Sequence, residues 1–459
     1  MAFGLLALTY SQPKKKDIMF KNYLLLSLKV LKRKPFYTFI SLFGISFTLT
    51  ILMVISSMAD ASIGNNAPMT DRDNYIFVNY MERSVESIDT VLIVDSVLME
   101  SGIMRYDTTM NFNENNSNST NNLNYKFLDQ NLRTIASAEN YTFLSNNYQT
   151  DVYLDGRKVN LRTFFVDANY WDVFDFNFVA GSPFSPEDNT QANQVAVITT
   201  RAAKEYFGIT DASVIGREIV LNEKVFTVKG LVARPLMDDQ YINGDVFMPL
   251  LTIDARQLAQ DELYGPFNAV LKASSPAGTK AIQEELNFLA ENFQLPPDSW
   301  FKQIALHNAN FFEYFAQSIV QEQDAAKAKR LLYIPLIILL LLFVALPLIN
   351  LINLNVSRVF ERKGEIAVRK AFGANPSDIL MQFIFENMVL TFIGGIIGAV
   401  LAIGLINYIN NNDLLSKVSL SLSPMVFVYF IILIFFFALL SGVIPAYRMS
   451  RTNIANSLR

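Results

Sequence analysis

The sequence predicts an α-helical membrane protein with four transmembrane helices, one N-terminal and three C-terminal, and a large extracytoplasmic α/β domain inserted between spans 1 and 2. Three observations lead to this fold class. Four apolar segments are each long enough to cross a hydrocarbon core of roughly 30 Å, for which a helix needs about 20 residues. The segment between the first and the second is long and too polar to span a membrane. Lysine and arginine gather beside those span ends that would share one side of the bilayer.

The composition agrees with this fold class. Hydrophobic residues make up 51% of the 459 residues and charged residues only 17%, whereas soluble domains carry about 25% charged residues. The chain has no cysteine, so disulfide bonds and thiolate metal sites are excluded. The chain is long enough for a large soluble domain in addition to several spans.

The N-terminal part is divided into three segments. Residues 1–18 are expected to be a disordered extension or the result of an alternative start, because the apolar Met1–Leu8 is too short for a signal-peptide core. Residues 19–35 interleave leucine with lysine and predict an amphipathic helix on the cytoplasmic membrane surface; a basic anchor without defined structure is the alternative. Residues 36–58 carry no charge and form the first predicted span.

Three further spans are predicted after the polar segment, at residues 331–353, 379–408 and 424–446. Residues 354–378 connect the second span to the third, and residues 409–423 form a short outer loop between the third and the fourth. Residues 447–459 form a tail. Helices buried in a large soluble core are the alternative, but charge-free segments of this length favour membrane spans.

The distribution of lysine and arginine predicts the orientation of the spans. Basic residues are frequent before span 1, between spans 2 and 3, and after span 4, whereas the loop between spans 3 and 4 has only Lys417. By the positive-inside rule, the basic segments and both termini lie in the cytoplasm. The basic residues are Lys14, Lys15, Lys16, Lys21, Lys29, Lys32, Arg33 and Lys34, then Arg358, Arg362, Lys363, Arg369 and Lys370, and finally Arg448, Arg451 and Arg459.

Residues 59–330 therefore form an extracytoplasmic domain, with 36 acidic and 21 basic residues and a net charge of −15. Val195–Thr200 reads as a buried strand followed by a short helix that ends at Gly208. Glu218–Leu221 and Lys224–Val228 flank a two-residue turn and predict a β-hairpin. In Lys280–Phe293, apolar residues share one face of a predicted helix.

Two more features of this domain are predicted from composition and periodicity. The Asn/Ser-rich tract Asn111–Asn124 is expected to be a mobile loop or tip. From about Phe311 to Arg330 the helical pattern continues into span 2, which predicts a helical stalk joining the domain rigidly to the membrane.

The charge-dense segment between spans 2 and 3 predicts a helix, a tight turn and a second helix at the membrane surface. Glu365 and Arg369 are spaced for a favourable i,i+4 ion pair on a short solvated helix. Gly373 suits a left-handed cap after its end. Asn375 and Pro376 are then the N-cap and the first residue of the next helix. A simple positive-inside hairpin is the alternative.

Small residues and one acid stand out in span 3. Gly394, Gly398 and Ala402 repeat every four residues, and Gly395 lies one position from the first of them. Small residues at this spacing let helix backbones approach closely, either within the chain or at a dimer seam. Glu386 is the ionisable residue well inside the span and is a functional candidate by default, although it is near enough to the cytoplasmic end to reach the surface.

No catalytic constellation is found in the sequence. The single histidine, His307, has no metal-ligand spacing around it, and a packed or surface histidine is the simpler interpretation. The phosphate-binding pattern Gly-x4-Gly-Lys-Ser/Thr is absent, so no ATP-binding loop is expected here. We therefore expect a non-catalytic chain that binds no cofactor and no metal. The clusters of basic residues lie in membrane-proximal segments, which argues against nucleic-acid binding.

The layout of one span, a large outer domain and three spans resembles permease subunits of the MacB/FtsX family of ABC transporters. The segment ERKGEIAVRKAFGA, the glycine-rich third span and the ending GVIPAYRMSRTNIANSLR are similar to the family's C-terminal permease domain. DANYWDVFDFNFVAGSPF and IGREIVLNEKVFTVKGLV resemble the MacB-type periplasmic domain more loosely. The resemblance implies that residues 354–378 contain a coupling helix that contacts the ATPase. Its expected contact residues are Glu361, Arg362, Gly364, Glu365, Ile366, Arg369, Lys370 and Gly373.

The resemblance also implies a function, partners and a location. The chain would be a multi-pass protein of the bacterial inner membrane whose large domain is periplasmic, surrounded by membrane lipid. A separate ABC ATPase subunit would hold ATP and Mg²⁺, and its motion would be transmitted to the periplasmic domain for efflux of a substrate such as a peptide or antibiotic. Homodimers, heterodimers with a related permease, a periplasmic adaptor and an outer-membrane channel are further implied partners. The alternatives are an FtsX-like regulator of a cell-wall hydrolase and a lipoprotein-releasing permease.

Overall fold

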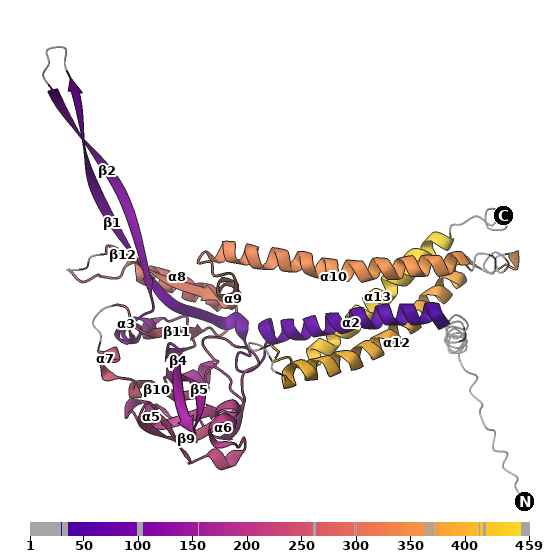
Figure 1. Ribbon diagram of the computed structural model, residues 1–459, viewed down its shortest axis with the longest axis horizontal. Coiled ribbons are helices and arrows are strands. Elements are labelled where there is room, and N and C mark those ends of the chain that lie inside the picture. Colours follow the sequence, from indigo (N-terminus) through magenta and orange to yellow (C-terminus); the bar gives the residue numbers. More distant parts are fainter. Residues whose placement is uncertain are drawn as a thin grey trace, which may run out of the picture. The chain divides into compact units, whose positions relative to one another are not determined.

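The computed structural model describes residues 29, 35–98, 104–154, 156–259, 263–297, 299, 301–361, 364, 368, 371–373, 375–412, 414–415 and 419–450. The chain forms two compact units, one made of Met1–Gly64 and Ile334–Arg459 and the other of Asn65–Tyr333 (Figure 1). The predicted N-terminal extension and almost all of the predicted surface helix at residues 19–35 lie outside the described residues. The second unit corresponds to the predicted extracytoplasmic domain and is called the outer domain below.

Long apolar helices make up the first unit. They are α2 (Pro35–Ile63), α12 (Pro376–Asn411), α13 (Pro424–Ser450) and α10 (Ala325–Glu361), the last of which begins in the outer domain. Each predicted span lies within one of these helices. Among the described residues, Thr38–Ile63 and Ile384–Asn411 are long and apolar enough to cross a membrane, and Pro424–Leu440 is a shorter apolar stretch. The crossing of the bilayer by all four helices therefore stays a prediction.

Helices α2, α12 and α13 pack around a small apolar core and leave large apolar side chains on their outer surfaces. The core residues are Ile45, Leu49, Leu52, Met53, Leu390, Ala402, Val426, Phe430 and Ile434. In α10, every side chain from Leu336 to Phe343 is between 41 and 62% exposed, so apolar groups point in all directions around the helix. This distribution is expected for helices solvated by lipid rather than for a soluble core.

The outer domain is built on a twelve-stranded mixed sheet. Its main strand order is β12-β1-β11-β3-β5-β10-β7-β9-β6, while β2 pairs with β1, β4 with β5 and β8 with β9. Strand β10 runs parallel to β5, and β7 runs parallel to β9; the other pairs are antiparallel. The strands are β1 Tyr75–Leu98, β2 Met104–Asn121, β3 Asn140–Ser145, β4 Tyr148–Leu154, β5 Arg157–Val166, β6 Phe178–Gly181, β7 Val195–Thr199, β8 Glu218–Leu221, β9 Lys224–Val232, β10 Val246–Pro249, β11 Phe267–Lys272 and β12 Gln303–Asn310.

Short helices cover this sheet and close three apolar cores. The first core contains Ile282 and Leu286 of α8, the second contains Phe311 and Tyr314 of α9, and the third contains Ala202 of α6. The helices are α3 Tyr125–Asn131, α4 Tyr170–Val173, α5 Pro186–Thr190, α6 Thr200–Phe207, α7 Ala255–Leu258, α8 Gly278–Glu291 and α9 Phe311–Val320, with short 3-10 turns η1 Arg72–Asn74, η2 Leu132–Thr134, η3 Ala212–Val214 and η4 Leu250–Thr252.

Several local predictions are confirmed. The strand at 195–200 and the helix after it are β7 and α6, and Gly208 ends α6 with φ 73°. The hairpin is β8 and β9; Asn222 and Glu223 both have positive φ, as the two-residue turn between the strands requires. Helix α8 buries Ile282 and Leu286 as its periodicity predicts.

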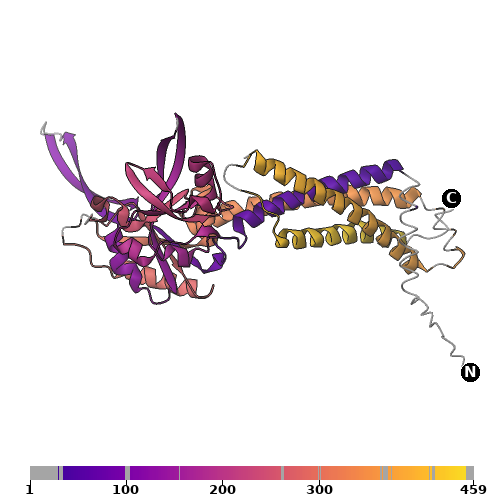
Figure 2. The same ribbon diagram turned by 90° about the horizontal axis from the view of Figure 1, so that it is seen from below.

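The prediction of a mobile loop at Asn111–Asn124 is wrong. Residues up to Asn121 belong to β2, which pairs with β1 in unbroken antiparallel register from Met81↔Asn121 to Leu98↔Met104. The two strands extend from the sheet as a ribbon in both views (Figures 1 and 2). Composition misled the prediction because Asn and Ser are depleted in strands, whereas here the partner strand supplies the β-branched residues and the backbone pairing.

The predicted uninterrupted helix from Phe311 into the second span is also wrong. Helix α9 ends at Val320, where Gln321 takes a left-handed conformation with φ 57°. Helix α10 starts at Ala325, after Asp324 accepts a hydrogen bond of 2.7 Å from the backbone N–H of Lys327. The helical periodicity continues across this break, so the pattern of apolar residues alone gave no sign of it.

Asp167 is a buried carboxyl group that ties β3 to the end of β5. It accepts hydrogen bonds from the Thr142 hydroxyl at 2.6 Å and from the backbone N–H of Phe143 at 2.9 Å and of Tyr170 at 3.1 Å. Burial raises the pKa of Asp167 from 3.8 to about 6, although these hydrogen bonds pull the pKa downward. The Asp167 carboxyl thus binds its proton more strongly in the folded state than in the unfolded state.

We predict that Asp167→Asn weakens the pH dependence of unfolding between pH 4.5 and 7. Because the folded-state pKa is raised, the stability that proton binding at Asp167 contributes is present below about pH 4 and is lost as the pH rises through about 6. The loss is on the order of 1–3 kcal/mol. Urea unfolding at several pH values measures it. The control is Asp211→Asn, since the exposed Asp211 has a lowered pKa and does not titrate in this window.

Candidate functional site

Helix α12 contacts α2 through the small residues that the sequence singles out. A Cβ atom added to Gly394 would lie 2.6 Å from Cγ2 of Ile45, and one added to Gly398 would lie 2.9 Å from the backbone oxygen of Ser46. Either position therefore requires the absence of a side chain. In this structure Gly394 and Gly398 lie where α12 approaches α2 closely within the chain.

The neighbouring small residues extend this contact to a third helix. A Cβ atom on Gly395 would lie 2.6 Å from Cδ1 of Ile434 in α13, and Ala402 is fully buried in the same apolar core. Gly394 and Gly395 thus face different partners although they are adjacent in sequence. We call the contact of Gly394, Gly395, Gly398 and Ala402 with α2 and α13 the glycine seam.

Two hydroxyl groups add polar contacts between the helices of this unit. The Thr50 hydroxyl lies 2.7 Å from the carbonyl oxygen of Ser46 and 3.1 Å from that of Gly398 across the seam. The Ser57 hydroxyl donates to the carbonyl of Ser421 at 2.7 Å. Hydrogen bonds of this kind help to hold helices together where water is excluded.

Glu386 lies in α12, two turns before the glycine seam. It is only 6% exposed, and Asn387 and Thr391 beside it are buried as well. The side chain of Glu386 is therefore enclosed by the helices of this unit. The possibility that it reaches the surface does not hold in this structure.

The predicted coupling segment is only partly described. Helix α10 ends at Glu361, and Gly364 is an exposed helical residue. Gly373 has φ 87°, and Asn375 has extended backbone before Pro376 opens α12, so the left-handed residue and the helix start are as predicted. The side chain of Asn375, however, makes no capping hydrogen bond. Arg362, Glu365, Ile366, Arg369 and Lys370 lie outside the described residues, and the Glu365–Arg369 ion pair stays a prediction.

The coupling segment also exposes an aromatic residue that the sequence analysis missed. Phe372 is 89% exposed, and Val368, whose carbonyl accepts a hydrogen bond of 3.1 Å from the N–H of Phe372, is exposed too. The sequence signal that could have indicated these two residues was the presence of an apolar pair in a charge-dense segment. Exposed aromatic residues that are flanked by charge are common anchors of protein–protein contacts.

Within the outer domain, α9 is anchored by an aromatic and acidic cluster. The ring of Tyr314 stacks on Phe77 with 4.6 Å between centroids, and its hydroxyl donates to Oδ2 of Asp239 at 2.9 Å. The backbone N–H of Tyr241 donates to Oδ1 of the same carboxyl at 2.9 Å. Burial raises the pKa of Asp239 from 3.8 to about 6.

The turn between α9 and α10 has its own contacts. Lys329 of α10 forms an ion pair of 2.9 Å with Glu313 of α9. His307 of β12 stacks on Tyr80, and its Nε2 lies 3.2 Å from the carbonyl oxygen of Gln323 in the turn. Burial lowers the pKa of His307, which keeps the ring neutral near pH 7. The single histidine is therefore a packing residue, as the simpler interpretation held.

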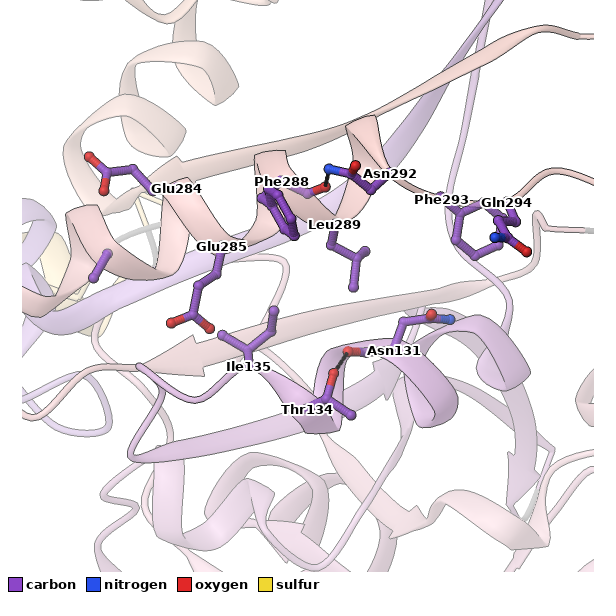
Figure 3. A pocket seen from close by; sticks show the side chains of 11 residues that line it. Asn131, Thr134, Ile135, Glu284, Glu285, Phe288, Leu289, Asn292, Phe293 and Gln294 are labelled. Carbon is purple, nitrogen blue, oxygen red and sulfur yellow. Dashed lines mark hydrogen bonds between the residues drawn. The ribbon is translucent and has the colours of Figure 1, made fainter.

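An open groove lies on the outer domain between α8 and the segment of α3 and η2. It encloses about 940 Å³. Figure 3 shows Phe288 and Leu289 of α8 above Ile135 and Thr134. Glu285 of α8 also lines the groove. It accepts a hydrogen bond of 2.8 Å from the backbone N–H of Ala136, so this carboxylate has a structural partner. The groove combines apolar and polar groups without a reactive pair.

Several other ionisable groups of the outer domain form structural pairs. Asp245 is buried and accepts the backbone N–H of Arg162 at 2.8 Å, and it also contacts the guanidinium of Arg201. Arg162 reaches Asp238 at 2.7 Å. No group of three or more metal-binding side chains occurs among the described residues.

Comparison with known proteins gives two family matches that follow one another along the chain. Residues 38–288 match the model of the MacB-like periplasmic core domain, and residues 337–454 match that of the FtsX-like permease C-terminal domain. The macrolide export ATP-binding/permease protein MacB of Acinetobacter baylyi is 28% identical over 250 residues, which are 53% of this chain and 34% of that protein. The chain thus covers about a third of that relative.

Two further proteins are similar over different lengths. The ABC transporter permease YvrN of Bacillus subtilis is 25% identical over 301 residues, which are 64% of this chain and 69% of YvrN. The crystal structure of the periplasmic region of MacB from Actinobacillus actinomycetemcomitans is 19% identical, covers 44% of this chain and 85% of that one, and has a TM-score of 0.32.

We predict that Gly398→Leu destabilises the glycine seam, because the new Cβ would lie 2.9 Å from the Ser46 backbone oxygen. Overpacking of this kind costs about 1–3 kcal/mol. The thermal unfolding midpoint of the purified protein in detergent should fall. Gly404→Leu is the matched control in the same helix, since nothing lies within 4 Å of its Cβ position. Equal midpoints for the two variants would contradict the seam.

We predict that Tyr314→Phe loosens α9. The change removes the hydrogen bond that the Tyr314 hydroxyl donates to the buried Asp239 carboxyl and leaves the one from the backbone N–H of Tyr241, at a cost of roughly 1–3 kcal/mol. Amide hydrogen exchange in α9 should become faster. Tyr333→Phe is the control, because the Tyr333 hydroxyl is exposed and lies 3.5 Å from its acceptor. Unchanged exchange in Tyr314→Phe would show that this hydrogen bond does not hold α9.

Proposed function

The chain belongs to the MacB/FtsX family of ABC transporter permeases, and on this premise we propose that it transmits the motion of a partner ATPase to its periplasmic domain. The observation that carries this proposal is the order of the two family matches, a MacB-like periplasmic core followed by an FtsX-like permease domain. The chain is accordingly a membrane permease with a large periplasmic α/β domain. The finer features of its topology, partners and substrate belong to the proposal.

In the proposed topology, four helices cross the bacterial inner membrane and both termini are cytoplasmic. The apolar surfaces of α2, α10, α12 and α13 support four spans. The basic residues at residues 354–378 and at both ends of the chain support the orientation. The outer domain, with its net negative charge, is then entirely periplasmic.

The segment at residues 354–378 would be the ATPase contact. Phe372 and Val368 would dock into an apolar pocket of the ATPase, while Arg362, Glu365 and Arg369 would form a polar rim around them. ATP and Mg²⁺ would stay on the ATPase, because this chain contains no Gly-x4-Gly-Lys-Ser/Thr loop. The chain itself would be non-catalytic.

Movement would reach the periplasmic domain through α10 and α9. Helix α10 starts in the outer domain and ends at the coupling segment, so it carries the chain across both units. Its first turns are tied to α9 by Lys329–Glu313, and α9 is tied to the sheet by Tyr314. The glycine seam would keep α2 and α12 together while α10, which is apolar on all sides, changes position.

We propose export of a periplasmic substrate as the outcome of this movement. The relatives are named for export of macrolides, syringafactin and pyoverdine. A peptide or an antibiotic is the corresponding substrate class for this chain. A homodimer or a heterodimer with a related permease would be the working unit, together with a periplasmic adaptor and an outer-membrane channel.

We predict that Phe372→Asp, and separately Arg369→Ala, reduces the ATPase activity that the permease stimulates in its partner by several-fold. The charge at Phe372 would remove the apolar anchor of the contact, and Arg369→Ala would remove a rim charge. ATP hydrolysis by the reconstituted complex in lipid measures the effect. The outer domain should stay folded, because the substitutions lie in the other unit.

Two controls match these substitutions. Tyr153→Asp replaces a 72% exposed aromatic residue of the outer domain and should leave ATP hydrolysis unchanged. Arg451→Ala removes a basic residue from the same predicted face of the membrane but not from the coupling segment. Full stimulation in both Phe372→Asp and Arg369→Ala would refute the assignment of this segment as the ATPase contact.

A further inference from the structure

Strands β1 and β2 continue as a two-stranded ribbon beyond the edge of the sheet. The pairing of β1 with β12 ends at Ser84↔Gln303, whereas its pairing with β2 continues to Leu98↔Met104. From Val85 onward the described residues show no third strand beside the ribbon. A two-stranded hairpin alone is at best marginally stable in water. A ribbon of this length therefore needs a partner on one of its faces.

The register divides the ribbon into a largely apolar face with one charged residue and a face with four charged residues. Directly opposed residues share a face and neighbours along a strand alternate, so the even-numbered residues of both strands occupy one face. We call it the even face. Its positions beyond residue 88 include Leu92, Val94, Leu98, Met104, Met110 and Phe112.

The odd-numbered face differs in charge. Over residues 88–98 and 104–114 it carries three carboxylates and one guanidinium group, whereas the even face has a single charged residue, Glu114, at its base. The remaining odd positions are valine, isoleucine, threonine and asparagine, and the charged ones are Asp89, Asp95, Arg105 and Asp107. Two copies of the odd face would bring six carboxylates together with only two guanidinium groups, so they would repel each other. Two copies of the even face would meet almost without charge.

We propose that the even face is a contact surface between two copies of this chain, packed face to face about a two-fold axis parallel to the strands. Such an axis places β1 of one copy over β2 of the other. The contact is then isologous, with the same surface on both sides. Both ribbons point in the same direction, as two copies held in one membrane require.

Residue sizes along the even face suit this arrangement. The register pairs Thr90 with Phe112 and Ser96 with Tyr106, so the aromatic residues belong to β2 and the short residues opposite them belong to β1. When β2 of one copy lies over β1 of the other, Phe112 of one copy is placed opposite Thr90 of the other, and Tyr106 opposite Ser96. The face is therefore complementary to its own two-fold copy.

The size of the even face shows what this contact can and cannot do. Six opposed pairs extend over roughly 34 Å at about 6.8 Å for every second residue, and a ribbon two strands wide buries on the order of 700 Å² in total. A stable dimer needs about 1,200–2,000 Å². The ribbon would thus pair only in a dimer that is held elsewhere, where the second contact forms intramolecularly. The inference rests on the dimeric permease of the proposed function.

Cysteine cross-linking of the full chain tests the inference, because the protein has no cysteine of its own. Leu92→Cys places a thiol on the even face, and the adjacent Ile93→Cys places one on the odd face of the same strand. Facing sheets lie about 10 Å apart, so a bis-maleimide of that length should join two copies. We expect a several-fold larger cross-linked fraction for Leu92→Cys than for Ile93→Cys in native membranes.

A second pair of variants tests whether the cross-link depends on the even face. With Val94→Cys as the reporter, Leu92→Asp should abolish the cross-link and Ile93→Asp should preserve it. Equal cross-linking at residues 92 and 93 would instead indicate edge-to-edge pairing and overturn the proposal. The mass of the purified permease in detergent distinguishes failure of the ribbon contact from failure of the proposed dimer. A dimer without an even-face cross-link refutes the ribbon contact alone, and a monomer refutes the proposed dimer as well.

Discussion

The antiparallel pairing of β1 with β12 is the constraint on which the outer domain depends. Strand β1 is the first strand of the domain and β12 the last, and Ile76 pairs with Asn310. Asn310 is also the N-cap of α9, with a reciprocal hydrogen-bond pair to Glu313. The chain therefore enters and leaves the domain at the same end of one β-ladder. Any displacement of α9 acts on the sheet at this ladder, and any displacement of the ladder acts on α9.

Aromatic packing fixes α9 to this ladder. Phe77 of β1 lies against Tyr314 of α9, with Tyr241 beside both, and their rings fill the second core. The buried Asp239 binds Tyr314 and the backbone of Tyr241, and its pKa is raised by burial. Polar groups enclosed in this way specify one arrangement, because any other leaves a buried carboxyl without its partners. The joint to α10, by contrast, uses an ion pair and hydrogen bonds nearer the surface.

The two units differ in which side chains are buried at their packing contacts. In the outer domain, apolar residues are enclosed in three cores, and buried carboxyl groups such as Asp239 and Asp245 have hydrogen-bond or ion-pair partners. In the helical unit, small residues and hydroxyl groups occupy the contacts, and large apolar residues are outside. This is the arrangement expected where lipid replaces water and hydrophobic burial no longer drives helices together. Family membership and the physical pattern therefore agree on a membrane permease, reached by independent routes.

Features that depend on short-range chemistry could be predicted from the amino-acid sequence alone. The four apolar helices, the turn at Asn222–Glu223, the cap at Gly373 and the close packing at Gly394 and Gly398 all follow from local patterns, because backbone conformation and side-chain size are properties of single residues. The strand at Asn111–Asn121 could not be predicted in this way, because its conformation comes from pairing with β1 and not from its own composition. The break at Gln321 and the burial of Glu386 were likewise not indicated by the spacing of residues in the sequence.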